Sequence, residues 1–197
     1  MSDKTSKIRT IRVAVKGVSP LLMNPMTDAT LEELRTKVRV QRSKDISLQE
    51  EAGQKLYKND TGKIGIPMVN LISCLAEAGR KVKNGKGNIS TADSSTIYGF
   101  MNIEDEFFSF SEEDSAWVPD KRRGVMTKDK IAVCIVRPKF KQWGFETTIT
   151  IDEAECAVET VKRLFETAGK YVGLCDFRPK CNGPFGRFKV DKWKVVE

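Results

Sequence analysis

The sequence predicts an α+β fold, because segments that alternate like strands and segments with helical periodicity follow one another along its 197 residues. Six such segments come in the order strand, helix, strand, strand, helix, strand. This is the order of the ferredoxin-like, or RRM-like, βαββαβ core that RNA-recognition domains also use. Two long stretches, 19–63 and 83–130, interrupt it, and we expect them to be insertions in a single domain spanning 1–197. The predicted core then comprises 8–18, 64–82 and 131–196.

The first two core segments have the clearest patterns. Residues 8–18 alternate apolar and polar side chains, as a strand with one buried face does. Apolar residues then recur at helical spacing from Met68 to Val82, directly after Pro67. Because a proline suits the first turn of a helix, we expect a helix over this stretch.

The middle of the core is predicted to be a hairpin. Residues 131–136 form a continuous apolar run, which is typical of a central strand buried on both faces. The segment 138–142 then breaks the run, beginning with a proline, and alternation resumes over 143–151. We expect these two strands to pair with each other.

The last part of the core is predicted to be a helix followed by a strand. Asp152 suits the N-cap of that helix, and Gly169 suits its end. A loop of glycines, prolines and basic residues, 173–187, comes next. The final strand, 188–196, shifts its alternation near Asp191, which indicates a β-bulge.

Both insertions exceed the usual length of loops in a compact domain, and such loops are commonly functional. The first carries a charged stretch over 30–57 that we expect to be helical. The second carries an acidic tract, 104–114, and we expect it to project as a flexible hairpin.

Composition excludes several classes of enzyme. The chain has 34 Lys and Arg against 27 Asp and Glu, a formal net charge of +7, and no histidine. Without histidine there is no Ser-His-Asp or Cys-His machinery, no imidazole general base and no His-ligated zinc. The charged N-terminus does not resemble a signal peptide, and no apolar run is long enough for a membrane span, so we expect a cytoplasmic protein with no membrane partner.

The cysteines are five in number and scattered, with no CxxC pair. Cys74, Cys134 and Cys156 lie in apolar periodic segments, and we expect them to be small buried side chains. Cys175 and Cys181 flank a loop and are close enough in sequence to meet. The pattern still favours free thiols in a reducing compartment over a disulfide or a metal site.

Basic residues gather at three places beside the predicted core, and aromatic residues lie among them. Cations that neutralise phosphates next to flat rings that stack on bases are what a single-stranded nucleic acid requires. Solvated lysines and core aromatics would produce the same pattern residue by residue, so both interpretations stay open for each. The basic residues are Lys121, Arg122, Arg123, Lys128 and Lys130, then Arg137, Lys139 and Lys141, then Arg178, Lys180, Arg187 and Lys189; the aromatic ones are Phe140, Trp143, Phe177, Phe185 and Phe188.

The glycine-rich loop is the most distinctive segment. Gly173, Gly183 and Gly186 permit positive φ and close backbone approach, so their amides are candidates to face a phosphate. Arg178 and Arg187 would add charge-assisted hydrogen bonds. The loop matches neither GxGxxG nor a P-loop, so no nucleotide site is predicted. The alternative is a tight connection between helix and strand that needs glycines only for its geometry.

Three motifs together resemble the RAMP superfamily, the Cas7-like group of CRISPR RNA-binding proteins. They are GVSPLLMN after the first strand, IPMVNLISCLAEAGRK at the first helix and GPFGRFKV before the last strand. The GPFGRFKV ending is also similar to that of small phage proteins, so the resemblance extends to a phage-encoded relative of this family. The family implies an RRM-like palm with inserted finger-like and thumb-like elements that stacks side by side along an RNA. It would place the following residues near the RNA backbone: Ser19, Pro20, Met68, Asn70, Arg178, Gly183, Gly186 and Arg187.

We therefore expect a non-catalytic protein that binds single-stranded RNA or DNA, needs no cofactor or metal, and oligomerises along its ligand. Other CRISPR-type subunits are expected as further partners. Two alternatives remain. A metal-dependent RNase would use Asp28 or Asp176. A protein-interaction module, such as a viral mimic or inhibitor of a CRISPR complex, would use the acidic tract 104–114.

Overall fold

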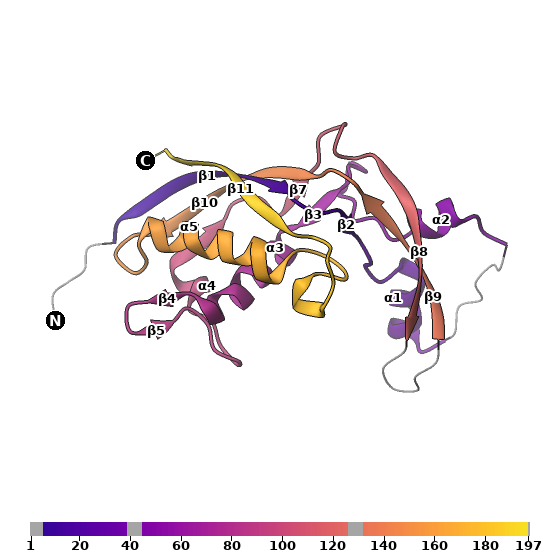
Figure 1. Cartoon of the computed structure of the whole chain (residues 1–197), viewed down its shortest axis with the longest axis horizontal. Coiled ribbons are helices and arrows are strands. Elements are labelled where there is room, and N and C mark those ends of the chain that lie inside the picture. The colour runs from indigo at the N-terminus through magenta and orange to yellow at the C-terminus, as the bar shows by residue number, and fades with distance from the viewer. Residues whose placement is uncertain (1–5, 39–44, 126–131, 197) are drawn as a thin grey trace.

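The computed structural model describes residues 6–38, 45–125 and 132–196. Its main sheet has four antiparallel strands in the order β11-β1-β10-β6. Both long helices, α3 (Met68–Ala78) and α5 (Val158–Thr167), cover the same face of this sheet (Figure 1). The four strands are β1 (Ile8–Gly17), β6 (Met101–Ile103), β10 (Gly144–Asp152) and β11 (Phe188–Val195).

This arrangement confirms the predicted α+β, ferredoxin-like core. Along the chain its elements run β1, α3, β6, β10, α5, β11, and the last strand lies beside the first. The core is mainly apolar: Ile11 of β1, Ile149 of β10, Leu75 of α3 and Leu164 of α5 are all fully buried between the sheet and the helices. Burial of such side chains is the main stabilising contribution to a fold of this size.

The predicted second strand of the core is wrong. The apolar run after 131 does form a strand, β9 (Ala132–Phe140), but β9 belongs to a separate three-stranded sheet between β2 (Leu21–Leu22) and β8 (Trp117–Val125). β9 therefore does not pair with β10, and its first four residues are exposed or half-buried. The continuous apolar run of β9 is therefore not the sign of a strand buried on both faces.

The core position is taken instead by β6, a strand of three residues inside the second insertion. A strand of three residues shows no detectable alternation, so the sequence pattern points to the longer apolar run of β9 as the core strand. Pro138 does not break β9 either, because it lies opposite Pro119 of β8 and its carbonyl accepts a hydrogen bond from the Met23 amide at 3.3 Å.

The other end of an elongated molecule is formed by the β8–β9 hairpin and the helices of the first insertion (Figure 1). In the second insertion, β4 (Lys83–Asn84), β5 (Gly87–Asn88), α4 (Ile97–Phe100) and β6 lie instead at the end that holds the core. Helix α2 (Leu48–Gly53) packs against both strands of the hairpin, and α1 (Asp28–Thr36) lies at the same end of the molecule (Figure 1). The expected helical stretch 30–57 is therefore confirmed for 30–36 and 48–53, whereas 54–57 is not helical. Ser47 and Glu50 form a capping box at the start of α2. The remaining short elements are β3 (Gly65–Pro67), η1 (Gly79–Lys81), β7 (Phe107–Ser109), η2 (Ala168–Val172) and η3 (Pro179–Cys181).

The start and end of α5 differ from the prediction. Ala157 is its N-cap, whereas Asp152 ends β10 and accepts a hydrogen bond from the Ala154 amide at 3.0 Å in the preceding turn. The helix continues into η2, and the chain leaves at Gly173 with φ of 76°. Gly169 lies within η2, where a Cβ would sit 2.1 Å from the Phe188 carbonyl oxygen, so it serves close packing against β11.

Three smaller expectations have clear outcomes. The bulge is confirmed, because Ala14 pairs with Lys192 and Val15 with Val190, which leaves Asp191 as the extra residue. Cys74 and Cys156 are buried as expected, but Cys134 is exposed on β9; all five cysteines are free. No helix in the described ranges is long and apolar enough to cross a membrane.

Candidate nucleic-acid interface

The turn after β1 and the glycine-rich loop before β11 are joined by a set of backbone hydrogen bonds. The Arg187 amide donates to the Ser19 hydroxyl at 3.0 Å, and the Val18 amide donates to the Arg187 carbonyl at 2.8 Å. The Gly186 amide donates to the Pro20 carbonyl at 2.8 Å. Two of the three motifs therefore meet in space although they lie at opposite ends of the sequence.

The glycines hold this loop in shape. Gly173 and Gly186 have φ of 76° and 68°, as expected, and a Cβ on Gly186 would lie 2.0 Å from the Leu174 carbonyl oxygen. A Cβ on Gly183 would meet the Phe177 carbonyl at 1.8 Å. The idea that their amides face a phosphate is wrong. They donate within the protein, to the carbonyls of Ala168, Arg178 and Pro20.

The β8–β9 hairpin contacts the same loop through two arginines. A guanidinium nitrogen of Arg137 lies 2.6 Å from the Asp176 carboxylate, and the guanidinium carbon of Arg122 lies 4.9 Å from the centre of the Phe185 ring. Phe185 in turn lies beside Phe177, with ring centres 5.9 Å apart. The hairpin, the loop and the turn at Ser19 thus form one connected unit.

We call one surface of the hairpin the loop-side face: the side of β8 and β9 that carries Arg122, Arg137 and Lys139 and faces Phe177 and Phe185. Neighbours along a strand point to opposite sides. Lys121 and Arg123 therefore point to the other face of the hairpin, and the basic cluster is divided between two surfaces. Lys128 and Lys130 lie outside the described residues.

Several basic residues have protein partners. Arg137, a predicted contact, is 5% exposed and ion-paired with Asp176, so its guanidinium is engaged within the protein. Arg122 is exposed but pairs with Asp120 at 2.6 Å, and Lys139 lies 3.5 Å from the same carboxylate. The hydrogen bond from Arg122 holds the pKa of Asp120 below its usual range. Within the described chain, Lys121, Arg123, Lys141 and Arg187 are exposed and have no ion pair.

The aromatic residues are mostly core residues. Phe140, Trp143, Phe185 and Phe188 are at most 7% exposed, which excludes them as open stacking platforms. Phe177 alone of the five is half-buried. The interpretation as core aromatics is therefore the correct one for four of them.

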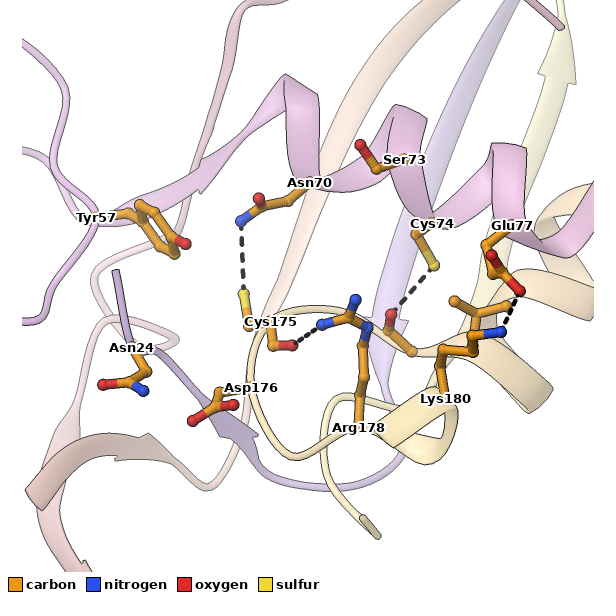
Figure 2. Close-up of a pocket in the computed structure, with 12 residues that line it drawn as sticks. Asn24, Tyr57, Asn70, Ser73, Cys74, Glu77, Cys175, Asp176, Arg178 and Lys180 are labelled. Atoms are coloured by element: carbon orange, nitrogen blue, oxygen red, sulfur yellow. Dashed lines mark hydrogen bonds and ion pairs between the residues drawn. The ribbon is translucent and has the colours of Figure 1, made fainter. Parts of the chain in front are cut away.

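A pocket of about 420 Å³ opens between α3 and the loop (Figure 2). Asn70, Ser73 and Glu77 line it from α3, and Arg178 and Lys180 line it from the opposite side. The buried thiols of Cys74 and Cys175 form part of its wall, together with Asn24, Tyr57 and Asp176. Desolvation raises the pKa of Cys175 to about 12, so this thiol is uncharged near neutral pH.

The pocket unites three predicted residues, Asn70, Arg178 and Lys180, with others that sequence reasoning missed. Asn24 and Ser73 lie within the motifs GVSPLLMN and IPMVNLISCLAEAGRK, although neither was singled out there. Tyr57 belongs to no motif and lies in the first insertion. Met68, at the start of α3, does not line the pocket. Membership of the motifs was therefore the signal that could have pointed to Asn24 and Ser73.

The residues of the two alternative functions are placed differently. Asp176 is held by Arg137, and Asp28 lies in the first turn of α1. No cluster of three or more potential metal ligands occurs among the described residues. The acidic tract is partly structured, because it contains β7 and because Asp105 accepts hydrogen bonds from the Thr147 hydroxyl at 3.0 Å and the Thr148 amide at 3.2 Å.

Comparison with known proteins gives a fold relationship only. No family model matches the chain, and no curated protein matches it. Among solved structures, it is similar to a chain in the cryo-EM structure of the Type III-B Cmr-beta bound to cognate target RNA, with a TM-score of 0.55 and 14% sequence identity. The match covers 97% of this chain and 61% of that chain, so this protein spans less than two thirds of its neighbour's length.

Proposed function

We propose that this protein is a non-catalytic, single-stranded RNA-binding protein, a Cas7-like subunit of a CRISPR-type complex or a viral relative of one. The observation that carries the proposal is the connected unit formed by the turn at Ser19, the glycine-rich loop and the loop-side face of the hairpin. Arg122, Arg178 and Arg187 place three guanidinium groups on this unit. Fold similarity to a chain from a complex bound to target RNA supports the choice of RNA.

The strand in this proposal passes over the loop-side face, from Arg187 toward Arg122. Guanidinium groups bind phosphates with two parallel hydrogen bonds, so these arginines suit the backbone of the strand. Arg123, on the opposite face of the same strand, is then not a phosphate contact. The proposal thus distinguishes Arg122 from Arg123, two neighbouring arginines that net charge alone would treat alike.

The test is a salt titration of binding to a fluorescent 20-nucleotide RNA and to the matching DNA. Each phosphate contact contributes about 0.7 to the slope of log K against log salt for a single strand. We expect Arg122→Gln and Arg187→Gln each to lower the slope by about that amount. Arg123→Gln, the adjacent matched control, and Lys86→Gln, in the turn between β4 and β5 at the far end of the molecule, should leave it unchanged. No binding at low salt, or equal effects of Arg122→Gln and Arg123→Gln, would overturn the proposal.

Assembly along the ligand is tested separately by light scattering during size-exclusion chromatography. The free chain of 22.2 kDa should elute as a monomer. Addition of RNA long enough for several copies should produce species whose mass increases with RNA length. A complex that never exceeds one copy would reject oligomerisation while leaving RNA binding intact. If the protein does not bind RNA but co-purifies with a CRISPR subunit, the result would favour the alternative that it is a protein-interaction module.

A further inference from the structure

The side chains that line the pocket between α3 and the loop include two carboxylates, Glu77 and Asp176, and two cations, Arg178 and Lys180. Lys180 is ion-paired with Glu77, and Asp176 is ion-paired with Arg137 from outside the pocket. Arg178 donates to the Cys175 carbonyl at 2.6 Å and leaves its other N–H groups available. A phosphate entering here would meet Arg178, which has no ion pair among the described residues, but also the two carboxylates of Glu77 and Asp176.

The remaining polar groups around the pocket are uncharged and have unused hydrogen-bonding capacity. Asn24 and Ser73 have no hydrogen-bond partner among the described residues. The Asn70 amide donates weakly to the Cys175 sulfur at 3.9 Å and also interacts with the Tyr57 hydroxyl, which leaves its carbonyl oxygen to accept from a ligand. Two amides and a hydroxyl can thus both donate and accept toward a ligand in the pocket.

The rest of the wall is aromatic or apolar. Tyr57 is half-buried at one end of the pocket, and desolvation raises the pKa of its hydroxyl, so that group remains a donor (Figure 2). The thiols of Cys74 and Cys175 are uncharged, because burial raises the pKa of both. A flat, uncharged molecule with donors and acceptors along its edge is the ligand that such a wall complements.

We propose that this pocket takes one unpaired nucleobase of the bound strand, held by the amides of Asn24 and Asn70 and by the ring of Tyr57. The inference rests on the proposed function, because the pocket borders the loop-side face: Asp176 belongs both to its wall and to the Arg137 ion pair. Unstacked bases of single strands are recognised in this way, by aromatic contact and by hydrogen bonds to the base edge. A volume of about 420 Å³ lies within the usual range for sites of small organic ligands.

The test compares RNA with a strand of the same length and charge whose residues are abasic. Base contacts of this kind are expected to favour the normal strand about fivefold or more. Asn70→Ala and Asn24→Ala should each reduce that ratio while leaving binding of the abasic strand and its salt slope unchanged. Asn102→Ala, an exposed asparagine on β6, is the matched control. Alanine favours a helix at position 70, and Asn24 is exposed, so we expect both variants to fold.

Failure of this inference differs from failure of the proposed function. If the abasic strand binds with the expected salt slope but the normal strand binds no better, the strand lies on the loop-side face and the pocket inference is wrong. If no strand binds, titration with uncharged nucleosides tests the pocket alone. Nucleoside-induced NMR shifts that Asn70→Ala abolishes would support it, and no shifts would overturn it. Displacement of nucleosides by inorganic phosphate would also overturn it, in favour of an anion site.

Discussion

Arg137 of β9 and Asp176 of the glycine-rich loop form an ion pair at 2.6 Å that fastens the hairpin to the core. The Arg137 side chain is 6% exposed, and its Nε atom is buried with no hydrogen-bond partner among the described residues. The guanidinium also lies 6.0 Å from the centre of the Phe177 ring, and Asp176 is the charged group that holds it. A buried ion pair contributes little when intact, but removing one member leaves the other charge uncompensated.

Asp176→Ala should therefore lower the free energy of unfolding by about 2 kcal/mol or more. Asp191→Ala removes the same group from an exposed position 3.9 Å from Lys189, and it should change stability by no more than about 0.5 kcal/mol. Urea denaturation of both variants checks the difference. Equal stabilities would show that the Arg137 charge finds water or another partner.

The shape of the loop should depend strongly on Gly186. Gly186→Ala forces a Cβ into a backbone with φ of 68° and to within 2.0 Å of the Leu174 carbonyl oxygen, so we expect a loss of at least about 2 kcal/mol. Gly87→Ala, where nothing lies within 4 Å and φ is not positive, should cost no more than about 0.5 kcal/mol. Thermal denaturation followed by circular dichroism measures both. A Gly186→Ala protein as stable as Gly87→Ala would contradict the described loop.

The Glu77–Lys180 pair should make stability depend on pH. The hydrogen bond from Lys180 lowers the pKa of Glu77 below its usual 4.5, so the pair stabilises the fold when pH is above 4.5. This contribution of about 0.5 kcal/mol is lost as pH falls through the lowered pKa. The stability difference between wild type and Glu77→Gln should therefore be constant near neutral pH and disappear in acid. Glu166→Gln, on the exposed side of α5, should show no such trend in urea titrations between pH 3 and 7.

Thiol reactivity should report which cysteines are accessible. Cys134 and Cys181 are exposed, whereas Cys74 and Cys156 are buried and the pKa of Cys175 is raised to about 12. Since the thiolate is the reactive form, an aromatic disulfide reagent at pH 8 should titrate two thiols rapidly and the others only after denaturation. Cys134→Ser and Cys181→Ser should each remove one rapid equivalent. If a third thiol reacted rapidly in the native protein and proved to be Cys74 or Cys175, the pocket wall would have to open.

Much of the fold follows from periodicity. β1, α3, β10 and the bulge at Asp191 were predictable because each has enough residues to display its period. β6 was not predictable, because a strand of three residues is too short to display a period, and the apolar run of β9 looked more like a core strand. The position of β9 depends on its pairing with β8, and no local sequence pattern reveals that contact.

The site was predictable where a residue's role is local. Positive φ at Gly173 and Gly186 follows from residue type and context. The burial of Arg137 depends on Asp176, and the pocket depends on Tyr57 and Asn24 coming from the first insertion. Charge alone therefore predicts both Arg122 and Arg137 as nucleic-acid contacts, although Arg122 is exposed and Arg137 is buried.

The hydrogen bond between the Ser19 hydroxyl and the Arg187 amide spans 168 positions of sequence. A ribosome must therefore add these 168 residues after Ser19 before the two halves of this junction can meet, and contacts of such long range form late and slowly. A nascent chain that stops short of the glycine-rich loop would have β1 and α3 but no partner for the turn that follows β1. The surface proposed for RNA would then be complete only after the glycine-rich loop has been synthesised and has folded against the turn at Ser19.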